Sequence, residues 1–255
     1  MTLSRQQRIA GMIAAALVFL VALALAPRLP QPQEYHRFAD QRAIWGIANG
    51  LNVLSNLAFL VVGAWGMGFL TGRRGTFIDS IERLPYLIFF FGVALTCFGS
   101  GYYHLAPDNE RLVWDRLPMT IGFTALFAAI LGERVGLKPA LRLLPLFMLA
   151  GLGSVFYWIW TEHAGRGDLR PYLFVQFFPI IAIPLLIALF PPRYNRAVDL
   201  AYVVAFYVLA KVLEGYDNQV NAATANLVSG HTLKHLAAAV AVWFALRMLQ
   251  KREPV

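Results

Sequence analysis

Long apolar segments dominate this chain and constrain its fold more than any other feature. Eight are apparent, at about residues 8–26, 51–71, 84–104, 116–132, 142–160, 172–190, 197–213 and 231–249. Each approaches the roughly 20 residues that an α-helix needs to cross about 30 Å of hydrocarbon. Only 14% of the residues are charged, against about 25% in soluble domains. The sequence therefore predicts an all-α integral membrane protein with eight spans.

Basic residues are divided unequally between the two sides of the predicted bundle. The loops on the side of both termini hold thirteen Lys or Arg, and the opposite loops hold seven. The thirteen are Arg5, Arg8, Arg73, Arg74, Arg83, Arg134, Lys138, Arg142, Arg193, Arg196, Arg247, Lys251 and Arg252, and the seven are Arg28, Arg37, Arg42, Arg111, Arg116, Arg166 and Arg170. The positive-inside rule then places both termini in the cytoplasm. Membrane topology, rather than nucleic-acid binding, accounts for the net charge of +8.

The first apolar segment stands apart from the other seven. Its end, Ala24–Ala26, is similar to a signal-peptide cleavage site, but Pro27 directly afterwards disfavours cleavage. We therefore expect residues 1–39 to form a retained anchor helix with a polar linker, and residues 40–255 to form a seven-helix membrane domain. The single cysteine, Cys97, excludes an intrachain disulfide. No sequence pattern specifies an oligomeric state.

Three histidines lie at segment ends on one predicted membrane side. His231 and His235 are one turn apart at the start of the last segment, about 6 Å along the axis, so both imidazoles face the same way. His104 ends another segment at the same depth. Two His spaced i, i+4 with a third ligand from elsewhere are typical of catalytic zinc, which keeps a fourth position for water. The predicted metal ligands are His104, His231 and His235, on the extracytoplasmic side.

A hydroxyl and a carboxylate accompany these histidines. Ser100 precedes His104 by one helical turn, and Asp115 is expected to begin the next helix after a short polar loop. A carboxylate can take a proton from a metal-bound water, and a hydroxyl can donate to a developing oxyanion. Ser100 and Asp115 are therefore the predicted catalytic residues.

Each of these residues also has a simpler interpretation. A single His at a helix end is often an interfacial polar group, and Ser100 alone is typical of helix packing in membranes. Asp115 alone is typical of an N-cap or a first-turn acid. Gly99-Ser100-Gly101 is also compatible with a nucleophilic serine, but the strand–turn–helix context of the esterase elbow is missing.

These motifs together resemble the alkaline ceramidase family, within the superfamily of adiponectin and progestin receptor-like membrane proteins, as a bacterial-type member. The resemblance covers residues 40–250 and rests on Ser100-x3-His104, Asp115-Arg-Leu-Pro-Met119, His231-x3-His235 and Asn52-x-x-Ser-Asn56. It implies a seven-helix core with an intramembrane Zn²⁺ held by the three histidines. By the same resemblance Ser100 would stabilise the oxyanion and Asp115 would hold the water. A calcium site is also implied, but segment 34–40 is poor in acids and Asn49 stands where a carboxylate is expected, which counts against calcium.

The expected function is zinc-dependent hydrolysis of the amide bond of a ceramide-like long-chain lipid, giving a fatty acid and an amine such as a sphingoid base. Two alternatives stay open: a lipid esterase or remodelling enzyme on the same metal, and a non-enzymatic seven-helix receptor with structural zinc. The expected location is a bacterial inner membrane, with a membrane lipid as substrate. Haem is disfavoured, because a His pair at i, i+4 on one helix is unable to ligate both faces of the macrocycle.

Overall fold

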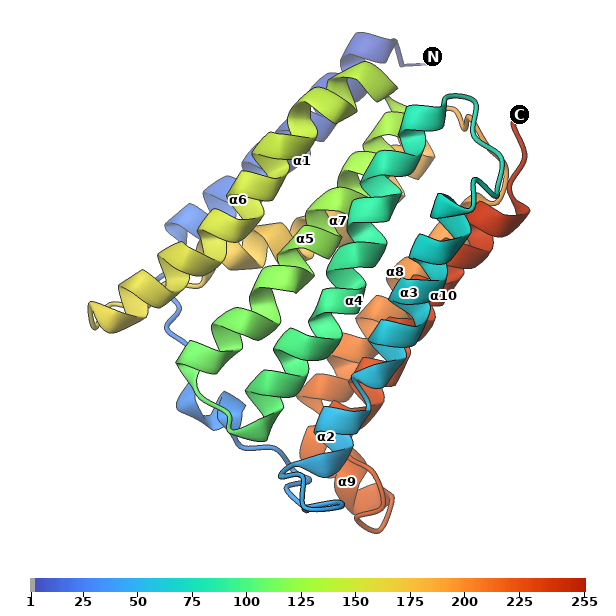
Figure 1. The fold of residues 1–255 in the computed structure, drawn as a ribbon. Helices are drawn as coiled ribbons and strands as arrows, with labels where there is room; N and C mark the ends of the chain where they lie inside the picture. The colour runs from blue at the N-terminus through green and yellow to red at the C-terminus, as the bar shows by residue number, and fades with distance from the viewer. Residues whose placement is uncertain (1–2) are drawn as a thin grey trace.

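The computed structural model describes residues 3–255, which form a bundle of long helices (Figure 1). Two 3-10 helices, η1 (Gln33–His36) and η2 (Ser80–Glu82), lie in the connections, and no β-strand occurs in the described part of the chain. The α-helices are α1 (Arg5–Leu25), α2 (Gly50–Leu54), α3 (Leu57–Thr71), α4 (Arg83–Leu105), α5 (Asn109–Arg134), α6 (Leu137–His163), α7 (Arg170–Leu189), α8 (Ala197–Gly215), α9 (Asp217–Ala223) and α10 (Gly230–Lys251).

The eight predicted segments coincide with helices, although not all eight have the character of a span. Six helical stretches are long and apolar enough to cross a membrane: α1, the α2–α3 pair, α4 with η2, α6, α7 and α10. The other two predicted spans correspond to α5 and α8, helices of 26 and 19 residues that carry several charged side chains. The protein is thus an all-α, membrane-embedded bundle, and a count of eight spans stays a prediction.

The long helices enclose a central space. Around this space α3 packs on α4, α4 on α5, α5 on α7, α7 on α8, α8 on α10, and α10 again on α3. Helix α6 packs outside this ring, on α5 and α7. The first and last described residues lie at one end of this bundle, and α2 and α9 lie at the other (Figure 1). The end of α4 and the start of α10 also belong to the α2–α9 end, so His104 and His231 meet there.

Helix α1 is attached to the outside of the bundle. None of its residues is buried, and it packs against α7 through Phe19, whose ring lies 5.8 Å from that of Phe174 and 6.4 Å from that of Phe178. A helix that stays apolar on its exposed faces suits contact with lipid rather than with water.

Helices α4 and α5 approach each other most closely beside the predicted catalytic residues. A Cβ atom on Gly99 would lie 2.0 Å from the carbonyl oxygen of Trp114. Gly99 directly precedes Ser100, and Trp114 directly precedes Asp115. The absence of a side chain at Gly99 therefore lets the two backbones bring Ser100 and Asp115 to one place.

We expect Gly99→Ala to destabilise the protein by about 1–3 kcal/mol, the usual cost of overpacking, and to lower any activity that needs Ser100 and Asp115 together. Thermal unfolding in detergent measures the first effect. Gly101→Ala is the matched control on the same helix, because a Cβ there meets nothing within 4 Å. Equal melting temperatures for the two variants would contradict this account of the α4–α5 approach.

Candidate metal centre

Three buried imidazoles meet at the α2–α9 end of the bundle. His104 comes from the last turn of α4, and His231 and His235 come from the first two turns of α10. One ring nitrogen from each lies within 4.8 Å of the others, which is close enough for a shared metal ion. The predicted convergence of the three histidines is therefore confirmed, while the identity of a metal stays a prediction.

The spacing between two of these rings suits a tetrahedral ion. The Nε2 atoms of His104 and His231 are 3.4 Å apart. Two nitrogens bound at 2.0–2.1 Å to one tetrahedral zinc lie about 3.3 Å apart by geometry. An N–H···N hydrogen bond would normally be shorter, near 2.9–3.0 Å. His104 and His231 thus fit a zinc-sized ion held through Nε2.

Ser55 orients the third imidazole. Its hydroxyl oxygen lies 2.7 Å from Nδ1 of His235 and 3.1 Å from the carbonyl oxygen of Asn52. A hydroxyl has one proton, so when Ser55 donates it to the Asn52 carbonyl, the bond to His235 is one in which Nδ1–H donates to Ser55. Nε2 of His235 is then left unprotonated and can ligate a metal.

We expect Ser55→Ala to weaken metal binding by about 10–100-fold, as is usual when the partner of a ligating histidine is removed. Titration with a competing chelator followed by elemental analysis measures this affinity. Ser154→Ala is the control, since Ser154 is buried on α6 and donates to the carbonyl of Gly151 in its own helix. An unchanged affinity in Ser55→Ala would show that this hydrogen bond does not position His235.

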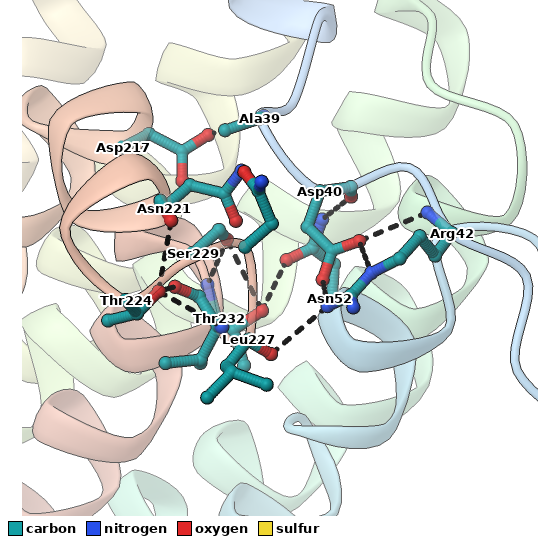
Figure 2. A network of polar contacts seen from close by, with 12 residues as sticks. Ala39, Asp40, Arg42, Asn52, Asp217, Asn221, Thr224, Leu227, Ser229 and Thr232 are labelled. Carbon is teal, nitrogen blue, oxygen red and sulfur yellow. Dashed lines mark hydrogen bonds and ion pairs between the residues drawn. The ribbon is translucent and has the colours of Figure 1, made fainter.

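A polar network fixes the start of α10 (Figure 2). Asp217 accepts the backbone N–H of His231 at 2.6 Å and that of Ala39 at 2.8 Å, so one carboxylate joins α9, α10 and the N-terminal linker. Thr232 donates to the side-chain oxygen of Asn52 at 2.8 Å. Ser229 is the N-cap of α10 and accepts from the backbone N–H of Thr232. These contacts fix the positions of His231 and His235 along the bundle axis and the rotation of α10 about its own axis.

The linker before α2 closes the outer side of the centre. The Phe38 ring lies 4.7 Å from that of His104 and 4.4 Å from that of His231. Asn49, which stands where the resemblance suggests a carboxylate, donates to the main-chain carbonyl of His104 at 2.8 Å. The linker therefore shields two of the imidazoles from water.

Asp40, an acid of the segment where the resemblance implies calcium, is engaged by an arginine. Arg42 donates to both carboxylate oxygens of Asp40, at 2.7 and 2.9 Å (Figure 2). These hydrogen bonds hold the pKa of Asp40 below its usual range. The carboxylate is thus already paired with a cation supplied by the chain itself.

Ser100 and Asp115 line one cavity together with His235. The prediction that Asp115 begins a helix is wrong, because α5 starts at Asn109 with Asp108 as its N-cap. Asp115 lies almost two turns inside α5, buried at the level of Ser100 on α4. It is therefore neither an N-cap nor a first-turn acid, and the structure leaves those simpler interpretations without support.

The cavity has a volume of about 330 Å³ and runs from His235 into the bundle. Its apolar part includes Phe89, Val93, Leu126, Ile180, Ile183, Val203 and Val242. Its polar end is closed partly by Gln31, Pro32 and Tyr35 from the N-terminal linker. A polar end beside the histidines and an apolar interior suit a ligand with a polar headgroup and a hydrocarbon chain.

A charged cluster centred on Glu214 lies at this polar end. Glu214 accepts from Lys234 at 2.6 Å and from the Tyr35 hydroxyl at 3.0 Å, and it also pairs with Lys211. Lys211 and Glu214 are three residues apart on α8, a spacing that favours their pairing. Tyr35 and Lys234 come from η1 and α10, so sequence spacing gives no signal that they join this pair. The cluster ties the linker to the helices that carry the cavity.

No protein-family model, curated protein or solved structure matches this chain. The resemblance to alkaline ceramidases therefore rests on the short motifs around Ser100, Asp115 and the three histidines. The chemistry of this site has to be argued from its own residues.

Proposed function

We propose that this protein is a zinc-dependent intramembrane hydrolase that cleaves the amide bond of a long-chain, ceramide-like lipid to a fatty acid and an amine. The observation that carries the proposal is that His235, one of three clustered imidazoles, lines the polar end of an apolar cavity together with the Asp115 carboxylate and the Ser100 hydroxyl. A structural zinc site would have no need of such a cavity, and a fatty-acid carrier would have no need of the histidines.

The side chains divide the chemistry as follows. His104, His231 and His235 would hold the metal, which when bound makes water acidic enough to ionise near neutral pH and polarises a carbonyl. Asp115 orients the attacking water and takes its proton, because it is the buried carboxylate that lines the cavity without a Lys or Arg ion pair in the described residues. Ser100 donates its hydroxyl proton to the oxygen on which charge develops.

The cavity indicates the expected substrate, and the distribution of basic residues indicates the expected side of the membrane on which it reacts. Its apolar interior accommodates an acyl chain while the amide lies near His235, so a lipid reacts without leaving the membrane. With the more basic, terminal end of the bundle in the cytoplasm, the site opens toward the extracytoplasmic side, as expected for an enzyme of a bacterial inner membrane.

A panel of long-chain amides and esters, offered to the detergent-purified protein, tests the proposal through released fatty acid. We expect amide hydrolysis that a zinc chelator abolishes and added zinc restores. Cleavage of esters alone would favour a lipid esterase or remodelling enzyme instead. Absence of turnover on every lipid, with one zinc firmly bound, would favour a receptor with structural zinc.

A further inference from the structure

We propose that Arg116 forms an anion subsite in the cavity, and that the preferred substrates are long-chain amides whose headgroup carries a carboxylate, of the N-acyl amino acid class. The inference deepens the proposed function and rests on it in treating the bound lipid as a substrate. The subsite itself is argued from burial, hydrogen bonding and charge around one guanidinium group.

Arg116 is held rigidly inside the bundle. Its side chain is 6% exposed and lines the cavity. The guanidinium carbon lies 4.1 Å from the ring centre of Trp158 on α6 and 4.6 Å from that of Tyr172 on α7. Two aromatic faces therefore fix the plane of the group, as is common where an arginine recognises a planar anion.

Only part of this guanidinium is satisfied. Nη2 donates to the side-chain oxygen of Gln31 at 2.6 Å. Nη1 is buried and has no hydrogen-bond partner among the described residues. A buried cation with unused donors is costly unless a ligand completes it. The cavity is the space into which such a ligand can bring its oxygens.

No carboxylate forms a direct ion pair with Arg116 in the part of the chain that the structure describes. The other cations of the cavity, Lys211 and Lys234, both pair with Glu214. Glu162 accepts from the backbone N–H of Gln31 and from the indole N–H of Trp158. Arg116 takes part in no ion pair within residues 3–255, and Asp115 is the one other carboxylate of the lining. Three cations, Arg116, Lys211 and Lys234, thus face two carboxylates, Asp115 and Glu214, so the charged side chains of the cavity carry an excess positive charge that favours an anion.

The position of Arg116 selects the kind of anion. It follows Asp115 directly on α5, and both residues line the cavity with His235. A charged group near the reacting amide therefore belongs to the headgroup rather than to the far end of the acyl chain. With Nη2 occupied by Gln31, the free donors suit one carboxylate oxygen better than a phosphate, which usually recruits several cations.

Paired substrates test the subsite. N-tetradecanoylglycine and its neutral glycinamide counterpart are each offered to the purified protein, and the ratio of their kcat/KM values for hydrolysis is measured. We expect the wild type to favour the carboxylate at least tenfold, and Arg116→Gln to lose most of that ratio because the cation is gone. Arg111→Gln is the matched control, since Arg111 lies on the same helix over the ring of Tyr102, outside the cavity.

Binding separates this inference from the hydrolase proposal. Tetradecyloxyacetate and its primary amide have no bond that an amide hydrolase cleaves, and their affinities are compared by calorimetry. We expect the acid to bind more tightly than its amide, and Arg116→Gln to lose this difference. The difference should persist in His231→Ala/His235→Ala, which would exclude chelation of the carboxylate by a bound metal as its cause. This result without any turnover would sustain the subsite and reject the hydrolase.

Three outcomes would overturn the subsite. One is a wild type with no preference for the acids. Another is an Arg116→Gln variant whose rates fall equally for both substrates, which would make Arg116 a structural residue. The third is binding of plain tetradecanoate that depends on Arg116 to the same extent, which would assign the guanidinium to recognition of the fatty-acid product instead. Gln31→Ala, which keeps the charge but frees the guanidinium, should reduce the preference by an intermediate amount.

Discussion

Replacing His231 and His235 by alanine is expected to reduce bound zinc from about one ion per chain to none, and to abolish lipid amide hydrolysis. A tetrahedral site of this kind uses three protein ligands and one open position, so His104 alone retains little affinity. Because the imidazoles are buried at the start of α10 rather than in the apolar core of the bundle, the helices should still assemble. Elemental analysis and released fatty acid are measured on the same preparation.

His163→Ala is the control for this experiment. His163 ends α6 with an exposed side chain that pairs with Glu110 at 2.9 Å, and it is not one of the clustered imidazoles. We expect this variant to keep both metal and activity. A folded His231→Ala/His235→Ala variant that retained its metal content would contradict the assignment of the centre, and one that lost metal but kept turnover would contradict its role in hydrolysis.

Asp115→Asn is expected to lower kcat by about 10²–10⁴-fold, the usual contribution of a positioned general base, while zinc content stays the same. The amide has nearly the same shape as the carboxylate but is unable to take a proton at neutral pH. Since Asp115 is not one of the grouped ligands, its replacement should leave the affinity of the histidines for metal unaffected.

Asp108→Asn is the matched control on the same helix. Asp108 caps α5 by accepting the backbone N–H of Arg111, and asparagine caps helices about as well as aspartate. We expect unchanged kinetics and stability for it. If Asp115→Asn kept full kcat, another group would have to serve as the base. Loss of zinc in the same variant would show that Asp115 acts through the metal site.

Local patterns were sufficient for much of the fold. The eight apolar segments all correspond to helices, because hydropathy and helical continuity are properties of consecutive residues. The start of α5 was misplaced for a related reason. The prediction placed the helix start at Asp115, beside the apolar run 116–132, whereas the helix begins six residues earlier, at Asn109, where Asp108 can cap it.

The sequence by itself determined the helices, the shared face of His231 and His235, and the residue types available to the site, because these depend on spacing within one helix. Only the tertiary structure decided how His104 reaches the same point, that Ser55 contacts Nδ1 of His235, and that Gly99 lets α4 meet α5. It also placed the guanidinium of Arg116, which has no ion-pair partner in the described residues, in a cavity lined by six helices: α3, α4, α5, α7, α8 and α10. Contacts between distant segments depend on how helices pack, and packing is a property of the whole chain.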